Sequence, residues 1–184
     1  MKNVFIIHGA YGYPGENWFP WLKKELEKEG YNVIVPTFPT PENQNLNNWL
    51  KVIGNYKKYF DQDTIVVGHS IGAGFLLNVI ERLERPIRSA FLVSGWTGLL
   101  NDSLDEINKT FIDKQFDWNK IKKNCQKFYV YNSDNDPYVP LKLGQDLAKN
   151  LEADLILVKN GGHIGSKAGF TEFPLLLNNI KELI

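Results

Sequence analysis

Thr64–Gly72 reads TIVVGHSIG and contains the pattern Gly-x-Ser-x-Gly around Ser70. The apolar run at 64–67 predicts a short buried strand, and the apolar positions from Ala73 to Ile80 predict a helix. A serine at such a strand-to-helix junction is typical of a nucleophile elbow. Its glycines let strand and helix approach closely, and the helix start would direct backbone N–H groups at the serine. The stretch therefore predicts a nucleophilic serine; the alternative is a glycine-rich turn with an incidental serine.

The rest of the chain alternates short apolar runs with segments of helical periodicity. Strands are predicted at residues 4–7, 31–35, 64–67, 87–93, 127–131 and 155–158. Helices are predicted after an N-cap at Asn17, between Leu46 and Phe60, after the elbow, at 118–124, around 143–151 and at 173–183. This alternation indicates an α/β fold with a mostly parallel sheet.

No repeat, low-complexity tract or linker interrupts the pattern, so residues 1–184 are expected to form a single domain. The longest connection between predicted elements is the polar segment 99–117, which has only weak helical signals. It is the one candidate for a cap or a pocket wall, and we therefore expect an open, shallow site without a large cap.

Composition limits the classes of function. The 184 residues include 21 basic and 21 acidic side chains, so no net charge points to nucleic acid or to an anionic membrane. Cys125 is the only cysteine, which excludes an internal disulfide framework. The apolar run 4–7 is too short for a signal segment, and a cytoplasmic location is expected. No dinucleotide fingerprint, phosphate loop or metal-ligand spacing is present, so no cofactor and no metal are predicted.

A catalytic triad built on such an elbow runs serine, acid, histidine along the chain. His163 is the only histidine after Ser70, and it follows two glycines just beyond the sixth predicted strand. The acid should follow the fifth strand, where both Asp134 and Asp136 occur. We favour Asp136 because Pro137 would stiffen its turn, whereas Asp134 could instead cap the turn through backbone N–H groups.

An oxyanion hole requires two backbone donors, one from the residue after the nucleophile and one from a loop after a neighbouring strand. Those donors are predicted to be the N–H groups of Ile71 and Ala10. His8 and His69 precede the position that the triad order allows for a base. Packing and hydrogen bonding near the site are therefore the expected roles of these two histidines.

The motifs Gly68–Gly72, Asp136–Pro140 and Gly162-His163 together resemble the triad motifs of α/β hydrolases. The segments Val93–Thr97 and Phe116–Cys125 narrow this resemblance. With the small size and the lack of a strand pair before the first strand, they are similar to the small serine hydrolases typified by retinoblastoma-binding protein nine and its bacterial relatives.

This resemblance covers nearly the whole chain. It implies a compact α/β-hydrolase fold, with helices on both faces of a six-stranded sheet in the order 2-1-3-4-5-6 and Ser70 at the carboxyl edge. It also implies serine hydrolase activity. We therefore expect a carboxylesterase-like enzyme that cleaves carboxylic esters, with small amides or thioesters as further substrates.

In that enzyme Ser70, Asp136 and His163 would be catalytic. Aromatic residues on the loops could line its pocket or could instead be surface side chains that cover helix ends, namely Tyr11, Phe38, Trp96 and Tyr138. The alternative is a module that binds a protein partner on a hydrolase scaffold, with weak or vestigial activity.

Overall fold

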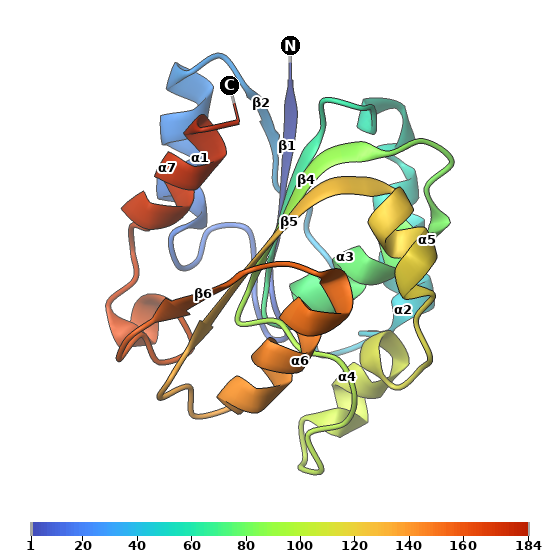
Figure 1. Ribbon diagram of the computed structural model, residues 1–184, viewed down its shortest axis with the longest axis vertical. Helices are drawn as coiled ribbons and strands as arrows, with labels where there is room; N and C mark the ends of the chain where they lie inside the picture. Colours follow the sequence, from blue (N-terminus) through green and yellow to red (C-terminus); the bar gives the residue numbers. More distant parts are fainter. Residues whose placement is uncertain (1, 184) are drawn as a thin grey trace.

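A six-stranded parallel sheet forms the centre of the computed structural model, which describes residues 2–183 (Figure 1). Its strands are β1 (Asn3–Ile7), β2 (Asn32–Ile34), β3 (Ile65–His69), β4 (Ile87–Val93), β5 (Cys125–Ser133) and β6 (Leu155–Val158). They are hydrogen-bonded in the order β2-β1-β3-β4-β5-β6, and every neighbouring pair is parallel. The predicted strand order is therefore confirmed.

Helices cover both faces of this sheet. On one face, α1 (Phe19–Lys28) lies beside α7 (Pro174–Lys181), both at the left of Figure 1. The other face carries α2 (Leu46–Gly54), α3 (Ile71–Arg82), α4 (Asp105–Ile112), α5 (Trp118–Lys123) and α6 (Leu141–Leu151). The predicted helices on both faces are thus confirmed.

The buried strands divide their side chains between two cores. In β1, Phe5 and Ile7 belong to the core beneath α3, whereas Val4 and Ile6 belong to the core beneath α1 and α7. Successive side chains of a strand point to opposite faces, so a strand buried on both faces needs an uninterrupted apolar run. This is why β1 and β3 appear in the sequence as continuous runs of valine, isoleucine and phenylalanine rather than as alternating patterns.

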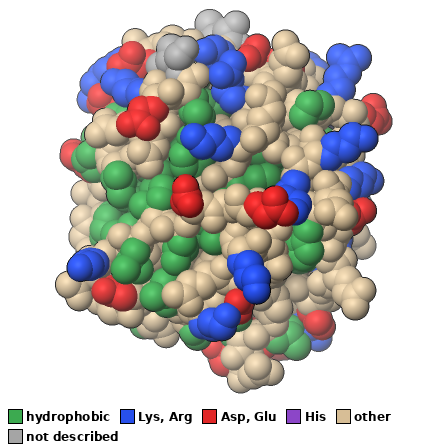
Figure 2. Space-filling model, viewed as in Figure 1, with side chains coloured by type: hydrophobic (Ala, Val, Ile, Leu, Met, Phe, Trp, Pro, Cys, Tyr) green, Lys and Arg blue, Asp and Glu red, His purple; other side chains and the backbone are tan. Residues whose placement is uncertain are grey.

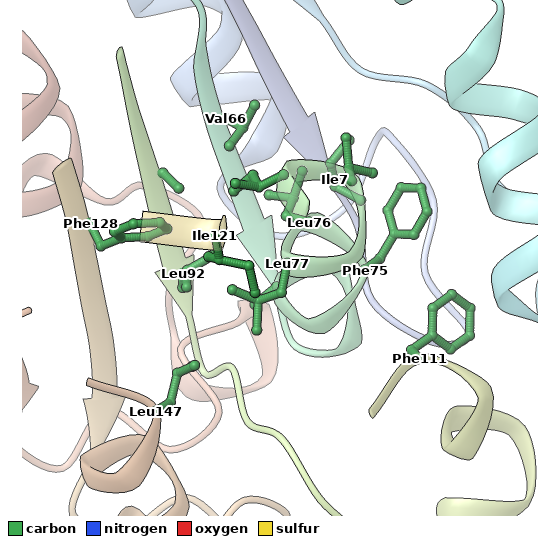
Figure 3. Close-up of a cluster of buried hydrophobic side chains, with 14 of the residues drawn as sticks. Ile7, Val66, Phe75, Leu76, Leu77, Leu92, Phe111, Ile121, Phe128 and Leu147 are labelled. Carbon is green, nitrogen blue, oxygen red and sulfur yellow. The ribbon is translucent and has the colours of Figure 1, made fainter. Parts of the chain in front are cut away.

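The central helix α3 is buried along most of its length and fixes the position of the elbow. Figure 3 shows Leu76 and Leu77 of this helix near the sheet, and Phe75 on the side of Phe111 of α4. The ring centroids of Phe75 and Phe111 lie 6.2 Å apart. A Cβ atom at Gly72 would lie 2.6 Å from the carbonyl oxygens of both Ile7 and His8. Only glycine permits this approach, and it brings the start of α3 directly against the end of β1.

Three local predictions are wrong. The helix predicted up to Phe60 ends at Gly54, and a short 3-10 turn at Lys57–Tyr59 follows. Asn17 is not the N-cap of α1, because Trp18 occupies that position and Asn17 Oδ1 accepts a hydrogen bond from Ser166 N at 2.8 Å. The segment 99–117 is more regular than predicted, since it contains the two-turn helix α4.

The face of the molecule seen in Figure 2 carries charged side chains of both signs. Figure 2 shows basic and acidic side chains interspersed on the visible face, with hydrophobic side chains gathered toward its left centre. Among residues 2–183, no helix has the length and apolar character needed to cross a bilayer.

Candidate active site

Ser70 lies at the tight junction between β3 and α3. Its backbone has φ 58° and ψ −130°, in a region that residues other than glycine rarely adopt. The turn is held by a hydrogen bond of 2.8 Å from Ser70 N to Val93 O at the end of β4. A Cβ at Gly9 would lie 2.9 Å from the Cβ of Ser70, so the loop after β1 lies directly beside the serine. This is the geometry of a nucleophile elbow.

His163 and Asp136 form a hydrogen-bonded pair at the carboxyl edge of the sheet. His163 Nδ1 donates to Asp136 Oδ2 at 2.8 Å, and the Asp136 side chain is completely buried. The other carboxylate oxygen, Oδ1, accepts hydrogen bonds from the N–H groups of Tyr138 at 2.9 Å and Val139 at 3.1 Å. Because Nδ1 carries the proton, Nε2 of His163 is the nitrogen that can accept a proton.

Asp134, the alternative acid in the sequence, makes a different contact. Its Oδ1 accepts a hydrogen bond from Asn160 N at 2.7 Å. The two residues flanking it bind the same loop: Ser133 Oγ accepts from Gly161 N at 2.9 Å, and Asn135 Oδ1 accepts from Gly162 N at 2.8 Å. Three consecutive side chains at the end of β5 and just beyond it therefore hold the three N–H groups that precede His163.

His69 provides a second constraint on His163. Its Nε2 lies 2.8 Å from the carbonyl oxygen of His163, and because a carbonyl only accepts, Nε2 must carry the proton. Burial, and secondarily the neighbouring His163, lower the pKa of His69 to about 3. His69 is thus a neutral donor that fixes the backbone of His163. In the same way His8 Nε2 accepts from Phe38 N at 3.0 Å, as expected for a histidine that supports the site.

Ser70 and His163 line one cavity of about 610 Å³, a size typical of small-molecule sites. Among the described residues, Ser70 Oγ does not cap α3 by a hydrogen bond to a backbone N–H group. His163 bonds to Asp136, and no hydrogen bond joins His163 to Ser70 Oγ. The wall includes Leu104 and Asn108, so the segment 99–117 does form a pocket wall. Aromatic side chains from three of the four predicted loops also line it, namely Tyr11, Trp96 and Tyr138. The expectation for Phe38 is wrong, because Phe38 is buried and stacks on Trp49 with ring centroids 4.6 Å apart.

The two predicted oxyanion donors lie near the serine, since Ile71 follows Ser70 in the chain and Ala10 follows Gly9, which lies against Ser70. Ala10 lines the cavity in the loop after β1, and Ile71 is the first residue of α3. Within residues 2–183, none of the backbone hydrogen bonds outside regular elements is donated by either N–H group. The first N–H of a helix has no acceptor within that helix. Both groups are therefore available to a ligand.

The described residues contain no cluster of three or more histidine, cysteine or acidic side chains that could hold a metal ion. Cys125 is buried, and burial raises the pKa of its thiol to about 12. A thiol in this state is a poor nucleophile, so Cys125 is not a candidate for the reacting group.

Comparison with known proteins agrees with this geometry. A family model described as serine hydrolase matches residues 4–182. The chain belongs to the serine hydrolase family. YdeN of Bacillus subtilis is 34% identical over 179 residues, which are 95% of this chain and 92% of YdeN. Serine hydrolase RBBP9 of Rattus norvegicus is 29% identical over 168 residues, 91% of this chain and 86% of the relative.

The solved structure of the ydeN gene product from B. subtilis has the same fold over the whole chain. Its TM-score against this serine hydrolase is 0.93 at 31% sequence identity, covering 100% of this chain and 98% of the other. The resemblance to small serine hydrolases that the sequence suggested is thus confirmed.

Lowering the pH is expected to destabilise this serine hydrolase through its buried histidines. The folded state keeps the pKa of His69 near 3 and also lowers that of His8 by burial, whereas both groups titrate near 6.5 when exposed. As pH falls below about 6.5, the unfolded chain therefore binds protons that the folded chain excludes. Each such proton lowers the free energy of unfolding by about 1.4 kcal/mol per pH unit.

Urea unfolding of the wild type between pH 7.5 and 5.5 measures this slope. His69→Gln is the matched variant, because an amide N–H can still donate to the carbonyl of His163 but does not titrate. Its slope should be shallower than that of the wild type, and equal slopes would contradict the assignment of a neutral, buried His69.

Proposed function

We propose that this serine hydrolase cleaves carboxylic esters through an acyl-enzyme on Ser70, with His163 as general base and Asp136 as its orienting acid. The observation that carries the proposal is the hydrogen bond between His163 Nδ1 and buried Asp136, at the cavity that Ser70 also lines. Family membership supports hydrolysis at a serine, and the ester substrate is our inference from this site.

In the acylation step Ser70 Oγ forms a bond to the carbonyl carbon while His163 Nε2 takes the hydroxyl proton. The tetrahedral intermediate then collapses, the bond to the leaving alkoxide breaks, and His163 returns the proton to that oxygen. Water repeats the sequence on the acyl-enzyme and releases the carboxylic acid. Asp136 keeps the proton of His163 on Nδ1 and stabilises the imidazolium that forms twice in each turnover.

The negative charge of the intermediate falls on the former carbonyl oxygen, and the N–H groups of Ala10 and Ile71 are the proposed donors to it. The position of Ile71 at the first turn of α3 adds the positive end of the helix dipole. Donors that are fixed before the substrate binds need no reorganisation during the reaction, which is why such groups stabilise the transition state effectively.

Mass spectrometry of the intact protein after reaction with a fluorophosphonate tests this proposal. We expect one adduct on the wild type, no adduct on Ser70→Ala, and strongly reduced labelling of His163→Ala under the same conditions. The absence of an adduct on folded wild type would refute the proposed nucleophile and favour the alternative of a protein-binding module.

A further inference from the structure

Asn108 lies on α4, whose position over the cavity is fixed by packing and hydrogen bonding. The ring of Phe111 packs against Trp49 with centroids 4.9 Å apart, and Asn78 Nδ2 donates to the Phe111 carbonyl at 2.7 Å. Asn108, one turn earlier, lines the cavity and is only 1% exposed. Helix α4 thus presents a buried amide side chain to the same cavity as Ser70.

A chain of hydrogen bonds determines which way this amide points. Tyr11 N donates to Thr40 Oγ1 at 2.7 Å, and the Thr40 hydroxyl donates to Gln44 Oε1. Gln44 Nε2 then donates to the carbonyl of Ile107 at 3.2 Å and to Asn108 Oδ1 at 2.8 Å. Because the Ile107 carbonyl can only accept, the amide of Gln44 cannot be reversed, and Asn108 must turn its oxygen toward Gln44.

The Nδ2 group of Asn108 is therefore directed away from Gln44. Among residues 2–183, the side-chain hydrogen bonds of Asn108 use its oxygen and none uses Nδ2. In the described part of the chain, five side-chain polar atoms are sealed from solvent without a partner, and Nδ2 of Asn108 is not among them. Nδ2 thus keeps some accessible surface, and Asn108 as a residue borders the cavity.

We propose that Asn108 determines substrate specificity by donating a hydrogen bond from Nδ2 to a neutral oxygen of the substrate. The preferred esters would carry a hydroxyl, ether or carbonyl oxygen in the part that lies against α4. This inference rests on the proposed ester hydrolysis at Ser70 and names the class of substrate for the same site.

The physical reason is the cost of covering a polar group. A purely aliphatic chain that occupies this part of the cavity displaces water from Nδ2 and leaves the donor unsatisfied. An oxygen at the same place restores the hydrogen bond, and a site that contains a buried donor discriminates strongly against analogues that lack the acceptor. The amide is uncharged, so the discrimination depends on an acceptor atom and not on the charge of the substrate.

Ester pairs that differ by one atom test this proposal. The values of kcat/KM are compared between p-nitrophenyl esters of acyl chains of equal length. Pentanoate is compared with 3-methoxypropanoate, and hexanoate is compared with 3-ethoxypropanoate and with 4-methoxybutanoate. In the alcohol part, butyl acetate is compared with 2-methoxyethyl acetate. For each variant, the kcat/KM of the oxygen-containing ester is divided by that of the aliphatic ester. This ratio is then divided by the same ratio for the wild type, which cancels the intrinsic reactivity of the two esters.

Asn108→Asp keeps an oxygen for Gln44 Nε2 and replaces the donor by an acceptor, while Asn108→Leu removes both polar atoms. For at least one position of the oxygen we expect the ratio to fall about tenfold in both variants. Leu104→Ala is the matched control, because it alters the same wall without changing a donor, and its ratio should stay within about twofold of wild type.

Ratios in both Asn108 variants that equal the wild-type ratio at every oxygen position would overturn the proposal. So would a wild type that reacts with the fluorophosphonate but hydrolyses none of the oxygen-containing esters. The proposed function fails in a different way, namely by loss of the Ser70 adduct in the same wild-type sample. Circular dichroism of each variant verifies folding, and Asn108→Asp, which is nearly isosteric, provides the test if Asn108→Leu does not fold.

Discussion

Ser70→Ala is expected to lower kcat for ester hydrolysis by about 10⁴-fold or more, and His163→Ala by a similar factor. The serine supplies the atom that forms the acyl bond, and without the imidazole its hydroxyl is too weak a nucleophile at neutral pH. Since the two side chains act in the same step, the double variant should be scarcely slower than either single variant. The residual rate then comes from binding and from the oxyanion donors.

Ser94→Ala is the matched control for this measurement. Ser94 also follows a strand of the sheet and has a positive φ of 50°, but its buried Oγ makes no hydrogen bond. Loss of that oxygen should leave kcat within about threefold of wild type, because no partner is lost with it. Retention of wild-type kcat in Ser70→Ala would place the reaction elsewhere in the protein.

The parts of this site that the sequence predicts are those in which neighbouring residues decide the structure. The elbow follows from a buried strand, two glycines and a helical pattern within residues 64–80, and the hydrophobic runs specify strands buried on both faces. The order of Ser70, Asp136 and His163 along the chain then follows from the topology of the fold. All of these signals can be read without knowing which distant segments meet.

The parts that sequence reasoning misses depend on contacts between residues that are far apart in the sequence. His69 reaches the carbonyl of a residue 94 positions away, and Ser133 to Asn135 bind N–H groups 26 to 28 positions further on. Asparagine is a favourable N-cap residue, yet Oδ1 of Asn17 accepts a hydrogen bond from the backbone N–H of Ser166, which is distant in the sequence. No periodicity or spacing encodes these partners.

The helix predicted up to Phe60 is wrong for a related reason. Phe60 lies at helical spacing in the sequence but packs from outside the helix, stacked on Phe5 with ring centroids 4.5 Å apart. Burial of an apolar side chain is favourable whether the residue lies in a helix, a turn or a loop. Apolar spacing near the end of a helix therefore predicts burial better than it predicts where the helix stops.

Asp136→Asn is expected to lower kcat by about 10³- to 10⁴-fold, through a change in the tautomer of His163. The N–H groups of Tyr138 and Val139 donate to Oδ1 of residue 136, so the amide oxygen of asparagine would remain there. Its NH₂ group would then face His163 Nδ1, which must become the acceptor. The imidazole proton moves to Nε2, and that nitrogen can no longer take the proton of Ser70.

Asp134→Asn provides the matched control, because the amide oxygen can still accept the hydrogen bond from Asn160 N. Its kcat should remain within about tenfold of wild type, since the tautomer of His163 does not depend on this side chain. Comparing the two variants thus separates the acid that orients the base from the acid that positions its loop. If Asp134→Asn proved the slower enzyme, the orienting role would pass to Asp134, and the buried pair of Asp136 with His163 would be structural.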